Sequence, residues 1–208
     1  YTLTGKRTIA EAFKAQGDRT IGAISSFVLR RGTGISEGFE EYDDAVATRT
    51  DAALGHQQRD GALTAQALTD RLAASKGPVF AFLPLYEPHT PWDPPAKHAG
   101  RASPYDGDVA YADEIVGRFL DSLRSMGRYD EAVIAITSDH GEGLGDHGEK
   151  EHGIFLYRES LHVPLMIRLP KGRNGGRRVT TTVRQTDIAQ TLLDLAALPA
   201  LPDTDGES

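Results

Sequence analysis

Short apolar runs that alternate with longer amphipathic stretches constrain the fold of this chain more than any other feature. Strands are expected at residues 20–29, 79–86, 132–138 and 163–169. Helices are expected at residues 8–16, 61–76, 108–126 and 186–198. The second and third apolar runs are continuous, which is typical of strands buried on both faces. Alternating strands and helices predict βαβ units, and therefore an α/β fold with a mostly parallel sheet flanked by helices.

Charge and composition narrow the classes of partner. The 208 residues carry a net charge of −7, which argues against a nucleic-acid partner, because such proteins present a basic face. An anionic substrate is still compatible with this charge, since a bound cation can reverse the local field. The chain has no cysteine, which excludes disulfides and a cysteine nucleophile. It has no apolar run of the roughly 18 residues that a membrane span needs, so no membrane segment is expected in it.

The polar loop after the run at residues 132–138 carries the strongest chemical signal. It reads SDHGEGLGDHGEKEHG, and it begins where ligands bind in parallel α/β sheets, at the carboxyl end of a strand. Asp139 and His140 stand at the strand end, and Gly141 lets the chain turn so that both side chains reach one ion. A carboxylate and an imidazole suit Ca²⁺, Mg²⁺, Mn²⁺ or Zn²⁺. The competing interpretation is a solvated loop, and two ligands alone do not complete a metal site.

A second loop, EPHTPWDPP, places His89 just past the end of the run at residues 79–86. We expect His89 on the same edge as Asp139, where an imidazole can hydrogen-bond an anionic oxygen or protonate a leaving group. The alternative is a histidine held in place by the surrounding prolines. Asp108 and Asp113 are expected to complement the dipole at the start of a long helix rather than to act chemically.

The loop sequence and the following FLYRESLHVPLMIRLP resemble the C-terminal signature of the sulfatase family, within the alkaline phosphatase superfamily. The resemblance extends back in the family's order through VAYADEIVGRFLDSL, LYEPHTPWDPP and TIAEAFKAQGDRTIGAISSFVL, and so covers nearly the whole chain. It implies an alkaline-phosphatase-like α/β fold that is incomplete here. Residues 1–201 would be a partial catalytic domain, and residues 202–208 an acidic, disordered tail.

The resemblance also implies roles for individual residues. Asp139 and His140 would bind one divalent cation, Ca²⁺ first, with Mg²⁺, Mn²⁺ and Zn²⁺ left open. His89 would contact the transferring group or the leaving group. His152 stands where many family members have a lysine, and it would act beside His89 as a second catalytic residue. His147 would contact the substrate.

Two departures from the family pattern are expected: the N-terminal segment with the nucleophile is missing, and the smaller C-terminal subdomain is absent or cut short after Ser208. Family members carry an N-terminal pair of acidic metal ligands and a C/S-x-P-x-R motif that supplies the nucleophile, and that motif does not occur in these 208 residues. The chain is therefore expected to be a fragment that is inactive by itself, with exposed strands that favour self-association. The activity expected of the complete protein therefore rests on the family resemblance alone.

The function expected from the resemblance is metal-dependent hydrolysis of a small anionic ester, a sulfate ester first. The alternatives are a phosphate or phosphonate ester hydrolase, a phosphoethanolamine-type phosphotransferase, or a binding module without catalysis. Export to the periplasm or beyond is expected from the family alone.

Overall fold

The computed structural model describes residue 5, residues 7–46 and residues 57–208, and the structural statements below concern these residues. The α-helices are α1 (Ile9–Ala15), α2 (Gly61–Ala74), α3 (Pro104–Ser125), α4 (Arg158–Leu161) and α5 (Asp187–Leu195). The strands are β1 (Arg19–Ala23), β2 (Glu41–Asp43), β3 (Val79–Phe82), β4 (Ile134–Thr137) and β5 (Leu165–Arg168). The described 3₁₀ helices are η1 (Phe27–Leu29), η2 (Arg31–Thr33), η4 (Asp146–Gly148) and η5 (Pro170–Gly172).

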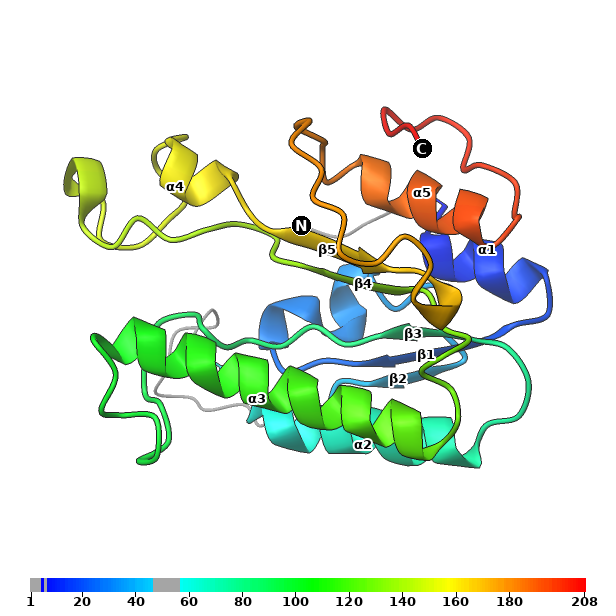
Figure 1. Ribbon diagram of the computed structural model, residues 1–208, viewed down its shortest axis with the longest axis horizontal. Coiled ribbons are helices and arrows are strands. Elements are labelled where there is room, and N and C mark those ends of the chain that lie inside the picture. The colour runs from blue at the N-terminus through cyan, green and yellow to red at the C-terminus, as the bar shows by residue number, and fades with distance from the viewer. Residues whose placement is uncertain (1–4, 6, 47–56) are drawn as a thin grey trace.

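Two groups of strands form the centre of the fold (Figure 1). β1 lies between β2 and β3 and runs parallel to both. β4 and β5 form an antiparallel pair, with Ile136 opposite Met166. The predicted α/β fold with a parallel sheet is confirmed. β5 is antiparallel because the chain between it and β4 contains no helix long enough to return along the strand, and α4 has only four residues.

Helices cover the two faces of the parallel sheet. On one face α2 and α3 bury Leu68, Leu72 and Leu123 against Ile21 and Ala23 of β1. On the other face the ring of Phe13 in α1 stacks on Phe80 of β3 with the ring centroids 4.7 Å apart. Strand side chains point alternately to opposite faces, so a single strand contributes to both layers. Figure 1 shows α2 and α3 together below the sheet and α1 on the other side.

Side-chain caps fix where the first three helices begin. Thr8 and Glu11 form a reciprocal capping box at α1, Asp60 accepts from the backbone N–H groups of Ala62 and Leu63 at α2, and Ser103 accepts from Asp106 N at α3. The cap at Ser103 starts α3 four residues before the predicted position. Asp108 therefore lies in the second turn and is 5% exposed, so the expectation that it complements the helix start was wrong.

The strands are shorter than their apolar runs. The run at residues 20–29 ends as a strand at Ala23, because Ser25 turns toward the segment after β3, where its hydroxyl donates to Pro84 O at 3.1 Å. β3 and β4 are mostly half-buried, whereas the sequence predicted burial on both faces. β5 leaves Met166 and Ile167 55% and 38% exposed. The apolar sequences predicted these strands correctly, but the described residues bury them less than the sequences indicated.

β2 was not predicted, because its sequence Glu41-Tyr42-Asp43 is charged. The strand is held at the sheet edge by ion pairs, among them Arg71 to Asp43 at 2.9 Å and Arg59 to Asp43 at 2.7 Å. Tyr42 is buried and donates to Leu29 O at 2.7 Å. Charged side chains are common on edge strands, where they discourage pairing with another chain.

None of the helices among the described residues combines the length and the apolar character that crossing a membrane requires. The boundary at residue 201 and the disorder of residues 202–208 stay predictions. In the structure this segment lies along α5, where Ser208 Oγ donates to Asp194 Oδ2 at 3.0 Å and Glu207 N donates to Asp187 Oδ1 at 3.0 Å.

Candidate active site

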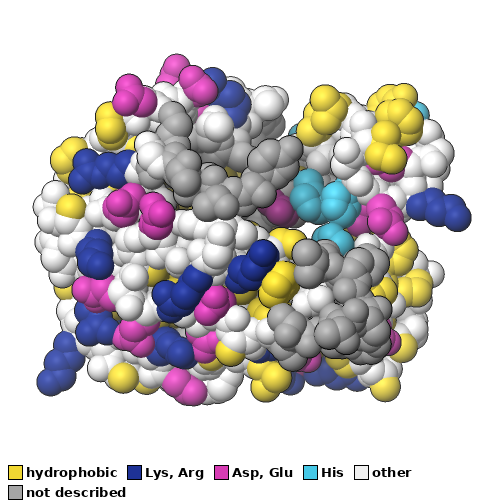
Figure 2. All heavy atoms as spheres, turned by 180° about the vertical axis from the view of Figure 1, so that it is seen from behind, with side chains coloured by type: hydrophobic (Ala, Val, Ile, Leu, Met, Phe, Trp, Pro, Cys, Tyr) yellow, Lys and Arg dark blue, Asp and Glu magenta, His cyan; other side chains and the backbone are white. Residues whose placement is uncertain are grey.

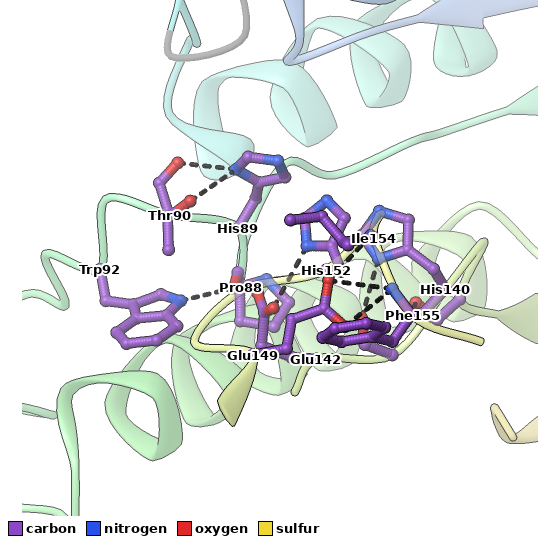
Figure 3. Close-up of polar contacts among 12 residues, drawn as sticks. Pro88, His89, Thr90, Trp92, His140, Glu142, Glu149, His152, Ile154 and Phe155 are labelled. Carbon is purple, nitrogen blue, oxygen red and sulfur yellow. Dashed lines mark hydrogen bonds and ion pairs between the residues drawn. The ribbon is translucent and has the colours of Figure 1, made fainter. Parts of the chain in front are cut away.

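The loops that follow β3 and β4 bring three histidines together, as expected for side chains at strand ends. The ring centroid of His152 lies 3.9 Å from that of His140 and 5.1 Å from that of His89, and the His89 and His140 centroids are 6.4 Å apart. Figure 3 shows the three imidazoles side by side. In the space-filling view of Figure 2, histidine side chains gather in a hollow of the surface. We refer to His89, His140 and His152 as the histidine cluster.

The turn after β4 is held in place by hydrogen bonds to its backbone. Gln185 Nε2 donates to Ser138 O at 3.0 Å and to Asp139 O at 2.6 Å, and Ser138 Oγ donates to His140 O. Gly141 is needed because a Cβ there would lie 1.9 Å from Glu159 O. These contacts fix the position of Asp139 and His140 at the end of the strand. Nothing in the sequence around Gln185 signalled its part in the turn.

Asp139 and His140 fit a partial set of metal ligands. Asp139 Oδ1 and His140 Nε2 are 3.7 Å apart, a spacing that one ion can bridge because metal–ligand bonds are about 2.0–2.6 Å long. His140 Nδ1 donates to Gly141 O at 2.9 Å, which leaves Nε2 as the ligand nitrogen. The Asp139 side chain is 88% exposed. The described residues contain no group of three or more His, Cys, Asp or Glu side chains arranged around one ion, so these two donors do not complete a site.

His89 is oriented by its own loop. Its Nδ1 lies 2.6 Å from Thr90 O, and because a carbonyl oxygen only accepts, Nδ1 carries the proton. The ring stacks on Tyr86 with the centroids 4.3 Å apart. Burial, with a smaller contribution from Glu151, raises the pKa of Tyr86 to about 12, so Tyr86 stays neutral beside the imidazole. His89 is thus an oriented imidazole that leaves Nε2 for a ligand.

His152 is held by a buried carboxylate. Its Nδ1 lies 3.2 Å from Glu142 Oε1, and the side chains of His152 and Glu142 are 20% and 5% exposed. The neighbouring Glu149 is also buried and accepts from Ile154 N at 2.8 Å and from Phe155 N at 3.1 Å. The sequence placed both glutamates in the polar loop without assigning them a part. The signal that could have drawn attention to Glu142 is the glycine on either side of it, whereas Glu149 has a glycine on one side only.

His147 does not join the cluster. It belongs to η4, its ring stacks on Tyr157 with the centroids 3.9 Å apart, and its Nε2 lies 3.8 Å from Glu159 Oε2. The family resemblance implied a substrate contact for His147. The structure directs its ring to Tyr157, and the substrate contact remains a prediction.

Three polar residues outside the histidine cluster, Ser25, Arg30 and Arg31, are held by the surrounding structure. Ser25 is fully buried. The Arg30 guanidinium lies 4.1 Å from the centre of the Phe27 ring, and Arg31 pairs with Asp44 at 3.5 Å. Two surface hollows, one beside Asp194 and Gly206 and one beside Tyr129, share no residue with the histidine cluster. The chemistry of the side chains, rather than the depth of a cavity, therefore identifies the candidate site.

Solved structures show the same fold. The phosphonate monoester hydrolase of Agrobacterium radiobacter superposes with a TM-score of 0.81 at 19% identity, over 100% of this chain and 62% of that chain. A protein of the alkaline phosphatase superfamily from Vibrio parahaemolyticus superposes with a TM-score of 0.74 at 18% identity, over 98% and 50% of the two chains. The fold is thus that of the alkaline phosphatase superfamily.

Sequence comparison is more specific. N-acetylglucosamine-6-O-sulfatase of Bacteroides thetaiotaomicron is 36% identical over 104 residues, 50% of this chain and 18% of the relative. Choline-sulfatase of Rhizobium meliloti is 37% identical over 107 residues, 50% of this chain and 20% of the relative. The matched segments thus span about a fifth of the length of these relatives. The family model described as Sulfatase matches residues 3–198, and the chain belongs to the sulfatase family.

Proposed function

We propose that the protein containing this chain is a metal-dependent hydrolase of small anionic esters, with sulfate esters as its first substrate class. The observation that carries the proposal is the histidine cluster beside Asp139, formed by two loops that are distant in sequence. Its setting in a sulfatase-family chain supports sulfate as the acid group, as do relatives whose names are sulfatases.

Each residue has a part in this proposal. Asp139 and His140 hold one divalent cation together with ligands from outside the described residues, with Ca²⁺ as our first choice by family resemblance and Mg²⁺, Mn²⁺ or Zn²⁺ as alternatives. When bound, the cation polarises the ester oxygens and offsets charge that develops on them. His89 and His152 contact the anion or the leaving-group oxygen, and an imidazole there can donate a hydrogen bond or a proton. His147 at the edge of the loop contacts the remainder of the substrate.

The same residues fit a second reaction class, the hydrolysis of phosphonate or phosphate esters. Its specific support is the superposition on the phosphonate monoester hydrolase at a TM-score of 0.81, which concerns the fold. Both classes need in-line attack at a tetrahedral centre with charge stabilisation on the equatorial oxygens. A phosphoethanolamine-type phosphotransferase belongs to the same group, and a binding module without catalysis is the alternative outside it.

The nucleophile is not assigned among these residues, since the C/S-x-P-x-R motif does not occur in the sequence. We therefore expect the 208-residue chain to be inactive by itself, and the activity to belong to a protein that also supplies the nucleophile. Export is proposed by family analogy, since an extracellular sulfatase homologue of Drosophila melanogaster is 34% identical over 96 residues, 46% of this chain and 8% of that relative.

The test compares two carboxylates of the same loop in the full native protein. Asp139→Ala should lower the hydrolysis of aryl sulfates by at least ~100-fold, because removing a ligand weakens metal binding as well as charge stabilisation. The exposed Asp146, which lies outside the histidine cluster, is the matched control, and Asp146→Ala should keep the activity. Parallel assays with aryl phosphates and aryl phosphonates decide the substrate class.

Calorimetry with Ca²⁺, Mg²⁺, Mn²⁺ and Zn²⁺ gives a readout independent of turnover. Cation binding that Asp139→Ala abolishes and Asp146→Ala retains supports the assignment. Full activity in Asp139→Ala, or turnover by the 208-residue chain alone, contradicts the proposal.

A further inference from the structure

The three residues of the histidine cluster share a pattern of hydrogen bonding at Nδ1, which their separate proposed roles do not explain. The Nδ1 atoms of His89 and His140 face the backbone carbonyls of Thr90 and Gly141, at 2.6 and 2.9 Å. Nδ1 of His152 faces a side chain instead, Glu142 Oε1 at 3.2 Å (Figure 3). Each of these oxygens accepts, so each Nδ1 carries the proton and each Nε2 is left for a ligand.

Glu142 is fixed in its position by the backbone on either side of it. Gly141 N donates to Ser160 O at 2.8 Å, and Gly143 N donates to Glu151 O at 2.9 Å. A Cβ at position 143 would lie 2.6 Å from Glu149 O, so only glycine permits this approach. The second hydrogen bond joins Gly143, the residue after Glu142, to Glu151, the residue before His152. Glu142 and His152 are therefore held in register by the backbone, although ten positions separate them.

Because Glu142 is buried, breaking its hydrogen bond with His152 would cost free energy. The Glu142 side chain is 5% exposed, and a buried carboxylate that loses its hydrogen-bond donor keeps the desolvation penalty without compensation. The closest acceptors of the Nδ1 atoms of His89 and His140 are backbone carbonyls, which a side-chain substitution does not remove. The acceptor at His152 Nδ1 is the side chain of Glu142, which a substitution can change.

We propose that Glu142 is a positioning residue that holds His152 in the Nδ1–H tautomer, so that Nε2 of His152 faces the ester. This inference rests on the proposed function only for the identity of the ligand at Nε2, and the tautomer itself is independent of it. Without the carboxylate His152 can place its proton on either nitrogen and rotate about its side-chain bonds. The direction of Nε2 toward the ester is then no longer fixed.

The test is nitrogen-15 spectroscopy of the full native protein with labelled histidine, at about pH 8, where an ordinary imidazole is neutral. We expect His89, His140 and His152 all to carry the proton on Nδ1. In Glu142→Gln, whose amide can either donate or accept, His152 should show a mixture of tautomers. His89 and His140 should stay unchanged and report that the site is still folded. A wild-type His152 protonated on Nε2 alone overturns the inference, whether or not the variant folds.

Glu149 supplies the matched control, because it is a buried glutamate of the same loop that accepts from Ile154 N and Phe155 N rather than from a histidine. Glu149→Gln should leave the three tautomers unchanged. With aryl sulfates or phosphonates, Glu142→Gln should lower kcat/KM by about 10–100-fold, the usual effect of losing the partner of a functional histidine.

The tautomer of His152 and the value of kcat/KM together distinguish a failure of this inference from a failure of the proposed function. If no ester is hydrolysed but the His152 tautomer changes in Glu142→Gln alone, the positioning stands and the proposed function fails. If ester hydrolysis is observed and Glu142→Gln alters neither the His152 spectrum nor kcat/KM, the proposed function stands and the positioning is refuted. A changed tautomer with unchanged kcat/KM also refutes a role of Glu142 in the reaction.

Discussion

The carboxylate of Glu87, a residue close to His89 in sequence, is buried and only partly hydrogen-bonded. Its Oε1 accepts from Gly61 N at 2.9 Å at the start of α2, whereas its buried Oε2 has no hydrogen-bond partner among the described residues. Burial raises the pKa of Glu87 above its usual 4.5; the hydrogen bond from Gly61 opposes that shift, and the charges of Asp60 and Asp108 add to it. The folded state therefore holds the proton more tightly than the unfolded state, and ionisation of Glu87 costs stability.

We therefore expect Glu87→Gln to increase the free energy of unfolding by an amount that depends on pH. An acid whose pKa is raised by folding lowers the free energy of unfolding as the pH rises through its unfolded and folded values. The variant should therefore be more stable than the wild type at neutral pH, and the difference should vanish below about pH 4. Urea unfolding followed by circular dichroism, at neutral pH and below about pH 4, measures this difference in stability. Lower stability of Glu87→Gln at neutral pH contradicts the prediction.

Glu114 provides a control with the opposite sign. Hydrogen bonds from Lys97 and His98, with the charge of Arg118, lower the pKa of Glu114 to about 2. A lowered acid pKa contributes stability above the unfolded pKa, and this is lost as the pH falls toward 2. Glu114→Gln should therefore reduce stability at neutral pH. Glu114 is in contact with solvent, so the effect should be small and sensitive to salt.

At the scale of elements, β2 combines the buried ring of Tyr42 with ion pairs on either side of it. The Asp43 and Arg59 side chains are 12% and 13% exposed, and Arg59 Nη1 lies 2.7 Å from Asp43 Oδ1. Burial by itself would raise the pKa of Asp43, but hydrogen bonds from Arg59 and Ala45 N and the charge of Arg71 lower it below its usual value. The contribution of Asp43 to stability is thus present at neutral pH and is lost on acidification below its unfolded pKa.

We expect Asp43→Ala to lower the free energy of unfolding by about 3 kcal/mol, because it leaves Arg59 buried without its partner. Asp44→Ala is the control, since Asp44 pairs with Arg31, whose side chain is 54% exposed, and such pairs contribute about 0–1 kcal/mol. Urea unfolding at neutral pH measures both. Equal effects of the two substitutions contradict the assignment of Asp43 as the anchor of β2.

The contrast between β2 and its neighbours shows what the sequence could predict. Apolar periodicity predicted α1 and α2, and continuous apolar runs predicted β3 and β4. The charged sequence of β2 has no such period, and its partners Arg19, Arg59 and Arg71 come from other parts of the chain. In the same way, the strand ends predicted His89 and His140 as neighbours, but nothing local could reveal that Glu142 holds His152.

At the scale of the whole molecule, exposed apolar side chains stand out after the histidine cluster. Ile154 and Leu156 are 79% and 81% exposed, and Phe155 and Tyr157 are 43% and 44% exposed. A contiguous apolar segment of this kind favours association. The expectation that the 208-residue chain self-associates stays a prediction, and this segment is a candidate contact surface in addition to the exposed strands.

A double substitution tests that cause. Ile154→Asp with Leu156→Asp should shift the 208-residue chain toward monomer in sedimentation velocity at micromolar concentrations, because charges oppose burial of the segment. Val179→Asp with Val183→Asp changes residues that are 74% and 52% exposed in a different segment, and it should leave the distribution unchanged. A monodisperse monomer in the unsubstituted chain contradicts the expectation.

The glycine contacts at positions 141 and 143 also decide how the site can move. Backbone hydrogen bonds join Gly141 to Ser160, Gly143 to Glu151 and Gly145 to Glu149, so His140 and His152 belong to one cross-braced body. His89 belongs to a second body, the proline-rich loop after β3. Among the described residues, ring contacts of His89 with His140 and His152 join the two loops. A shift of one loop relative to the other would therefore change the 5.1 Å separation of the His89 and His152 rings while each loop keeps its own internal hydrogen bonds.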